Sequence, residues 1–121
     1  MTRRTKNDSL KSLTQRVTEF RDARDWKQFH NPKDMALSLS LEVHELLELM
    51  QWKNGRELEK HLAQNHGAVS HELADALYWV LLLAHDLKID LPEALIEKIA
   101  HNEAKYPLHK SKGVAKKYDQ L

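Results

Sequence analysis

Two pairs of acidic residues stand inside apolar helical segments, and they restrict how this chain can fold. The first pair is Glu42 and Glu45, and the second is Glu72 and Asp75. The i, i+3 spacing places each pair on one face of one helix. Because unpaired carboxylates are costly in apolar surroundings and repel one another, two helices that bring these faces together need a cation between them.

The chemistry of the donors indicates which cation. Carboxylate oxygens suit a hard ion, so Mg²⁺ is the predicted cofactor. One Glu-x-x-Glu pair alone is usually a solvated helix face, but Asp75 interrupts an apolar segment that runs from Leu73 to Leu83, where an unligated carboxylate would destabilise the fold. Glu48 extends the first row by one more step and stays open as a peripheral ligand, a general base or a solvated side chain.

Two other kinds of metal site fit the sequence less well. A di-iron bundle requires Glu-x-x-His motifs, and the sequence has none. His71 and Glu72 begin the zinc protease motif His-Glu-x-x-His, but Asp75 stands at its last position. The absence of cysteine excludes thiolate metal sites and disulfides.

Charge and hydropathy limit the possible partners. Lysine plus arginine number 19 against 18 acidic residues, which is not the charge balance of a protein that binds a nucleic acid polymer. No apolar h-region follows the basic start, and the longest apolar run, Ala76 to Ala84, is too short to span a bilayer. We therefore expect a cytoplasmic protein with no membrane partner.

Hydrophobic periodicity predicts an all-α fold. Glycine and proline number only 3 each, and no stretch alternates with period two. The first helix is expected to begin at Asp8 or Ser9, and the second to run from an Asn31 cap to about Trp52, where Asn54–Gly55 ends it.

The second half of the chain adds further helices. A short amphipathic helix is expected around Leu58 and Leu62, a long one from a Ser70 cap to about Leu87, and a last one from Asp90 to just before Pro107. The sequence thus predicts one domain over residues 1–121, a four-helix bundle with residues 1–8 and about 108–121 as flexible tails. The two acid-bearing helices carry apolar residues on more than one face, which indicates an oligomer.

Aromatic and polar residues near the acids suggest a nucleotide pocket. Each tryptophan alone is more simply a core residue, but Trp26, Trp52 and Trp79 together can form a slot for a planar base, with stacking worth roughly 1–3 kcal/mol per base. His30 is placed to hydrogen-bond a base edge. On the last helix one face carries Lys98, Asn102 and Lys105, which suit a polyphosphate or sugar as well as plain solvent.

Four stretches carry a resemblance to a known family: Arg24–Pro32, Leu41–Trp52, His71–Asp75 and Lys98–Pro107. Together they resemble the MazG-like all-α nucleoside triphosphate pyrophosphohydrolases, and most closely the dCTP pyrophosphatase branch. The resemblance covers about residues 10–118. Within it, Trp79 stands where a tyrosine is expected, and His44 replaces a small residue.

The resemblance implies a hydrolase that forms a homodimer or a homotetramer. Its implied activity is Mg²⁺-dependent cleavage of a nucleoside triphosphate, dCTP or a modified pyrimidine nucleotide, between the α and β phosphates, which clears such nucleotides from the pool. Matched by position, the metal ligands are Glu42, Glu45, Glu72 and Asp75, the base-pocket residues are Trp26, His30, Trp52 and Trp79, and the nucleotide contacts are Asn102 and Lys105.

Two alternatives remain open at this point. One is a non-catalytic helical interaction module in which the acids hold a regulatory cation or only water. The other is a related pyrophosphatase that acts on phosphoribosyl-ATP, which the tryptophan-rich pocket disfavours.

Overall fold

The computed structural model describes residues 9–121, and these residues form helices and connecting turns with no strand. The elements are α1 (Leu10–Ala23), the 3₁₀ turn η1 (Lys27–Phe29), α2 (Pro32–Glu48), α3 (Gly55–Gln64), α4 (His66–Asp86), α5 (Leu91–Lys105), α6 (Leu108–Ser111) and the 3₁₀ turn η2 (Tyr118–Gln120). The predicted all-α class is confirmed. Within the described residues, no helix has the length and apolarity needed to cross a membrane.

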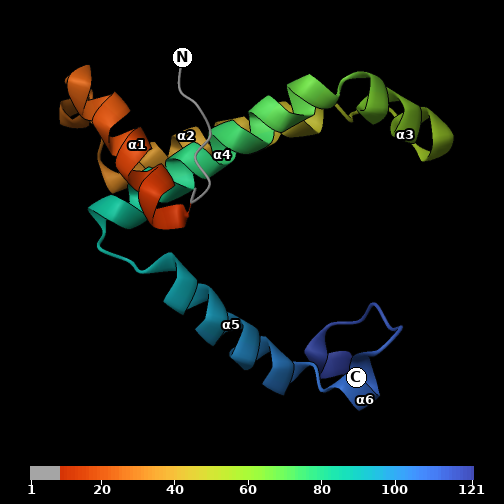
Figure 1. The fold of residues 1–121 in the computed structure, drawn as a ribbon. Helices are drawn as coiled ribbons and strands as arrows, with labels where there is room; N and C mark the ends of the chain where they lie inside the picture. The colour runs from red at the N-terminus through yellow and green to blue at the C-terminus, as the bar shows by residue number, and fades with distance from the viewer. Residues whose placement is uncertain (1–8) are drawn as a thin grey trace. The chain divides into compact units, whose positions relative to one another are not determined.

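The chain divides after Lys88 into two compact units. The first unit carries α1 to α4, and the second carries α5, α6 and η2. In the first unit α4 is the central helix, because α2 packs along it and α1 and α3 also contact it (Figure 1). The buried apolar side chains of this unit are Met35 on α2 and Leu81, Leu82 and Ala84 on α4.

Three predicted N-caps are confirmed by their hydrogen bonds. The side chain of Asn31 accepts from the backbone N–H of Asp34 at 2.9 Å, and that of Asp90 accepts from Glu93 at 3.0 Å. Ser9 caps α1 in the same way, whereas its alternative, Asp8, lies outside the described residues. Side-chain oxygens at these positions satisfy N–H groups that have no partner in the first helical turn.

The end of α2 differs from the prediction. The helix stops at Glu48 instead of about Trp52, because the next residues form tight turns in which Leu49 and Met50 bond to carbonyls three residues earlier. Trp52 then adopts a left-handed backbone with φ +70°. Gly55, predicted to end α2, instead opens α3 with φ +56°, a conformation that glycine adopts without strain.

The start of α4 also differs. The helix begins at His66, one turn before the predicted Ser70 cap, and the Ser70 hydroxyl donates to the carbonyl of His66 at 2.8 Å. Serine makes this bond inside helices as well as capping them, so its presence alone does not fix a helix start. Glu72 and Asp75 consequently lie well inside α4 and not in its first turn.

A buried ion pair joins α1 to the end of α4. Arg21 is fully buried, and its guanidinium donates to both carboxylate oxygens of Asp86, at 2.8 Å and 3.1 Å. A bidentate pair of this kind fixes orientation as well as distance. It therefore sets the position of α1 against the helix that carries the second acid pair.

We expect Arg21→Met to destabilise the protein by about 3–5 kcal/mol, because it leaves the Asp86 carboxylate without its partner in a mostly buried position. Chemical denaturation followed by circular dichroism measures this change. Lys11→Met, on an exposed face of the same helix, is the control and should cost no more than about 0.5 kcal/mol. Equal stability of the two variants would contradict the structural role given to the pair.

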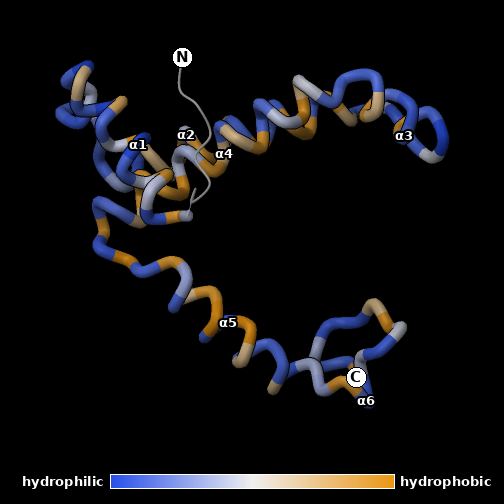
Figure 2. Tube along the Cα trace, in the orientation of Figure 1, coloured by the Kyte–Doolittle hydropathy of each residue, from blue (hydrophilic) through white to orange (hydrophobic). Residues whose placement is uncertain are grey.

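The second unit exposes much apolar surface. Leu95, Ile96 and Ile99 on α5 are 60%, 68% and 48% exposed. Figure 2 shows hydrophobic positions recurring along α5. A helix with such a face ordinarily buries it against another element or another subunit.

Candidate metal and nucleotide site

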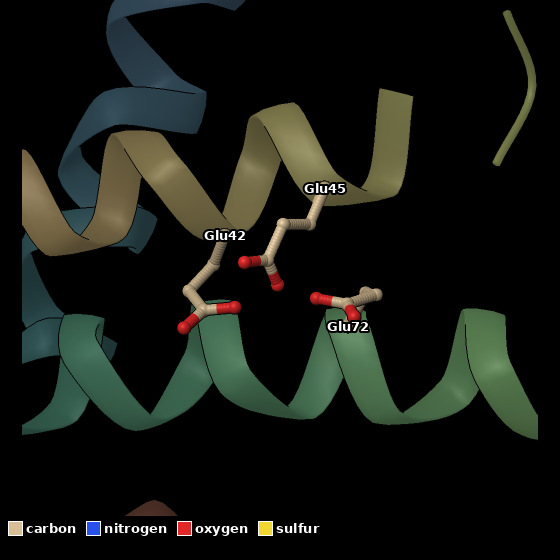
Figure 3. Close-up of side chains that lie close together, drawn as sticks. All are labelled: Glu42, Glu45 and Glu72. Atoms are coloured by element: carbon tan, nitrogen blue, oxygen red, sulfur yellow. The ribbon is translucent and has the colours of Figure 1, made fainter. Parts of the chain in front are cut away.

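Three of the four predicted metal ligands come together between α2 and α4. Glu42 and Glu45 project from α2, Glu72 projects from α4, and one oxygen from each lies within 4.8 Å of the others. Figure 3 shows the three carboxylates pointing toward one another across the gap between the helices. The i, i+3 spacing on α2 and the close packing of α2 on α4 produce this arrangement.

Asp75, the fourth predicted ligand, is one turn further along α4 and is exposed. It lies outside the group of three but lines a cavity together with Glu42. Its negative charge also contributes to raising the pKa of both Glu42 and Glu72. Asp75 is thus part of the same electrostatic environment as the three glutamates.

The cluster holds negative charge without compensation among the described residues. Glu42 and Glu72 each have one buried carboxylate oxygen without a hydrogen-bond partner. Burial, followed by the neighbouring Glu45 carboxyl and the charge of Asp75, raises the pKa of Glu42 to about 7, and burial together with Glu45 raises the pKa of Glu72. Oxygen donors that are buried, unpartnered and mutually repelling fit a hard divalent cation such as Mg²⁺.

A cavity of about 780 Å³ adjoins the acids within the first unit. Its lining comes from α1, α2, α4 and the α1–η1 turn: Arg16, Val17, Glu19, Phe20, Trp26, Glu42, Asp75, Tyr78 and Trp79. It thus combines carboxylates with four aromatic rings. The volume is within the usual range for small-molecule sites, roughly 300–1,000 Å³.

The aromatic wall contains two of the predicted base-pocket residues, Trp26 and Trp79. His30 is adjacent, with its ring 5.2 Å from that of Trp79, and its Nδ1 atom is buried with no hydrogen-bond partner. Burial and the nearby charge of Arg21 lower the pKa of His30, which favours a neutral imidazole able to donate and accept hydrogen bonds.

The other predicted contacts lie elsewhere in the chain. Trp52 is 87% exposed and is not among the residues that line the cavity. Lys98, Asn102 and Lys105 are on α5, in the second unit. The first unit therefore brings together the acids, Trp26, His30 and Trp79, but not Trp52.

Sequence reasoning missed several residues of this cavity. The sequence predicts no pocket role for Phe20 on α1, but this residue is 43% exposed, and its ring lies 5.7 Å from that of Trp26 and 6.2 Å from that of Tyr78. Tyr78 in turn contacts Trp79 at 5.1 Å. The position of Tyr78 directly before Trp79 in the sequence was the signal that could have identified Tyr78 as a pocket residue. Arg16 and Glu19 gave none, because charged residues on α1 resemble a solvated face.

Comparison with known proteins shows the family and the fold of this chain. Residues 37–121 match the MazG-like family. The chain is 40% identical over 115 residues to dCTP pyrophosphatase 1 of Rattus norvegicus and 36% identical to that of Homo sapiens, covering 93% of this chain and 68% of each relative. The crystal structure of a pyrophosphatase from Archaeoglobus fulgidus is similar with a TM-score of 0.78 and 37% identity, covering 88% of this chain and 99% of that one.

The family match covers well over half of the chain, and the fold agrees with a solved structure at substantial sequence identity. This chain belongs to the MazG-like family. Its fold is that of the all-α pyrophosphatases, as the resemblance implied.

The raised pKa of Glu42 predicts a pH dependence of the metal-free protein. Because the folded protein holds the proton up to about pH 7 and the unfolded chain only to about 4.5, this group stabilises the fold below pH 4.5, and its contribution is lost as pH rises through 7. In EDTA, Glu42→Gln should therefore raise the melting temperature at pH 8 more than at pH 5. A Glu59→Gln control on α3 should show no such difference, and an equal shift at both pH values for Glu42→Gln would contradict the assignment.

Proposed function

We propose that this protein is a Mg²⁺-dependent nucleoside triphosphate pyrophosphohydrolase. It would convert a pyrimidine deoxynucleoside triphosphate, dCTP or a modified form of it, to the monophosphate and pyrophosphate. One observation carries the proposal: Glu42, which has a buried carboxylate oxygen without a hydrogen-bond partner, clusters with Glu45 and Glu72 and also lines a nucleotide-sized cavity with aromatic walls. The names of the relatives, pyrophosphatase and dCTP pyrophosphatase 1, support it.

In this proposal Glu42, Glu45, Glu72 and Asp75 are the metal ligands. A bound Mg²⁺ supplies charge neutralisation for the phosphate oxygens and lowers the pKa of a coordinated water. The carboxylates would hold the cation beside the cavity, and one of them, or Glu48, would take the proton released when water attacks phosphorus. The bond that breaks is the one between the α phosphorus and the bridging oxygen, and the pyrophosphate leaves with that oxygen.

The base would occupy the aromatic end of the cavity. Trp26 and Trp79 are placed to stack on a planar ring, and Phe20 and Tyr78 complete the wall. His30, whose buried Nδ1 has no partner within the described residues, is available to hydrogen-bond a base edge. Lys98, Asn102 and Lys105 stay proposed as nucleotide contacts, and Trp52 as a base-pocket residue, on the strength of the family match.

Self-association is part of the proposal. Apolar side chains are strongly exposed on the helices of both units, among them Leu37 at 58%, Leu47 at 58% and Ile96 at 68%. A helix with strongly exposed apolar side chains ordinarily buries them against another element or subunit. We propose a homodimer or homotetramer, acting in the cytoplasm to clear unwanted nucleotides from the pool.

A product analysis tests the reaction. The purified protein is incubated with a panel of nucleoside triphosphates, with Mg²⁺ or with EDTA, and the products are separated. We expect a monophosphate and pyrophosphate from dCTP only when Mg²⁺ is present. Orthophosphate as the first product would exclude a pyrophosphohydrolase.

Substitution of the ligands tests the site. Glu45→Gln and Asp75→Asn should each reduce kcat at least about a hundredfold while the helical circular dichroism signal is kept, because each removes a charged ligand at the reacting centre. Glu59→Gln, an exposed acid on α3, is the matched control and should keep wild-type activity. Activity in Asp75→Asn would remove that residue from the proposed site.

Substitution of Trp79 tests the base pocket. Trp79→Ala should weaken nucleotide binding by about 1–3 kcal/mol through lost stacking, and it should narrow the preference for pyrimidines over purines. Two measurements on the same variant distinguish a base-stacking role of Trp79 from a role in core packing. One is the binding of dCTP and dATP to the metal-loaded protein, and the other is the melting temperature. A large loss of stability with unchanged base preference would make Trp79 a core residue only.

A further inference from the structure

The turn that ends α1 places Trp26 against Phe20. The backbone N–H of Trp26 donates to the carbonyl of Arg21 at 3.2 Å. The N–H of Asp25, which has a left-handed backbone with φ +54°, donates to the carbonyl of Asp22 at 3.0 Å. These two bonds are those of the Schellman motif, in which the residue after the turn packs back onto the end of the helix. Here the motif sets the Trp26 ring edge-on to that of Phe20, with 5.7 Å between their centroids.

The side chain of Arg24 is held against this aromatic pair by two kinds of contact. Its guanidinium carbon lies over the Phe20 ring, 3.8 Å from the centroid, and 5.9 Å from that of Trp26. Its Nη1 atom donates at 2.9 Å to the carbonyl of Phe20, in the last turn of α1, where intrahelical donors run out. The hydrogen bond therefore keeps the guanidinium over one face of the ring, where the cation also attracts the ring electrostatically.

Arg24 contacts the cavity wall without lining the cavity. Phe20 and Trp26 are part of the lining, and Arg24 is not. Phe20 also meets Tyr78 edge-on at 6.2 Å, and Tyr78 meets Trp79 at 5.1 Å, so the rings form a continuous row from α1 to α4. Because Phe20 is 43% exposed, apolar packing alone leaves much of its ring uncovered, and Arg24 supplies a contact that limits its motion.

We propose that Arg24 is a positioning residue for this aromatic wall and that it acts on the bound base through Phe20. Edge-to-face rings depend on one another's orientation, so a Phe20 ring held by Arg24 keeps Trp26 and Tyr78 at angles that leave room for a planar ligand. The identification of that ligand as a nucleobase rests on the proposed function. The role of Arg24 requires no contact with the phosphates or with the metal.

Nucleotide binding by the metal-loaded protein tests this role. The ligands are dCMP and α,β-methylene-dCTP, which has the charge of a triphosphate but is not cleaved between its α and β phosphates. Titration calorimetry gives the dissociation constant of each. Arg24→Met removes the guanidinium and keeps an unbranched side chain, and Arg24→Lys keeps the charge without the planar group. Arg56→Met, at an exposed arginine on α3, is the matched control.

We expect Arg24→Met to weaken the binding of both ligands by the same factor, about two- to fivefold, which corresponds to an exposed cation–π contact of about 0.5–1 kcal/mol. Arg24→Lys should lose part of the same affinity, and Arg56→Met none. In the cleavage of dCTP, Arg24→Met should raise KM and leave kcat within about twofold, since the base is bound alike before and during the reaction. A loss confined to the triphosphate analogue would indicate a direct phosphate contact and overturn the positioning role.

A double-mutant cycle with Phe20→Leu shows whether Arg24 acts through the ring. In the Phe20→Leu background, Arg24→Met should cause no further loss of dCMP affinity, because residues that act through one contact are not additive. Without nucleotide, Arg24→Met should change the near-ultraviolet circular dichroism, which reports ring orientation, and keep the far-ultraviolet signal. Full additivity, wild-type affinity in both Arg24 variants, or an unchanged near-ultraviolet spectrum would each contradict the proposal.

The outcome is separable from that of the proposed function. If dCTP yields pyrophosphate but Arg24→Met has the KM of the wild type, only the positioning role is wrong. If no triphosphate is cleaved, but Arg24→Met binds dCMP more weakly and Arg56→Met does not, the positioning role stands and the enzymatic proposal fails. Undetectable binding of both ligands to the wild type would overturn the wall as a base site.

Discussion

Repulsion among the carboxylates between α2 and α4 is the constraint on which the rest of this structure depends. Apolar packing of α2 on α4 holds Glu42, Glu45 and Glu72 within 4.8 Å of one another, and burial leaves two of their oxygens without partners. The packing therefore works against the electrostatics, as the raised pKa of Glu42 shows. A fold that keeps such an electrostatic conflict at one place commonly does so at a functional site.

The Arg21–Asp86 pair provides a useful contrast within the same unit. There, a fully buried guanidinium donates hydrogen bonds to both oxygens of a carboxylate, and its charge is compensated inside the protein. The acid cluster has no cationic side chain in a corresponding role among the described residues. Asp86 and Glu72 are on the same helix, α4, yet only Asp86 is paired with a cationic side chain among the described residues. The lack of a cationic partner is therefore specific to the acid cluster. This difference favours an external cation over a plain structural network of acids.

The sequence predicted the features that depend on the spacing of neighbouring residues. It did not predict the features that depend on contacts between residues far apart in the chain. The i, i+3 acids and the Asn31 and Asp90 caps need only neighbours along the chain, so their geometry could be anticipated. The start of α4 could not, because Ser70 bonds equally well inside a helix. Phe20 and Tyr78 were missed because an aromatic residue on a helical stripe looks like core until the partner helix is placed. The packing of Tyr118 against Tyr106 joins two separate elements of the chain, and hydrophobic periodicity does not predict such a contact.

The spacing of residues along α4 is compatible with the proposed binding of both a phosphate group and a base by this one helix. Glu72, Asp75 and Trp79 follow one another at i, i+3 and i+7, which places them in one row on the helix. At a rise of 1.5 Å per residue, Asp75 and Trp79 are separated by about 6 Å along the axis. A sugar with its 5′ carbon spans a similar distance between a base and the α phosphate. A phosphate at the acids and a base at Trp79 would therefore suit the same helix face, and the proposed base pocket and the proposed metal site would both depend on the position of α4.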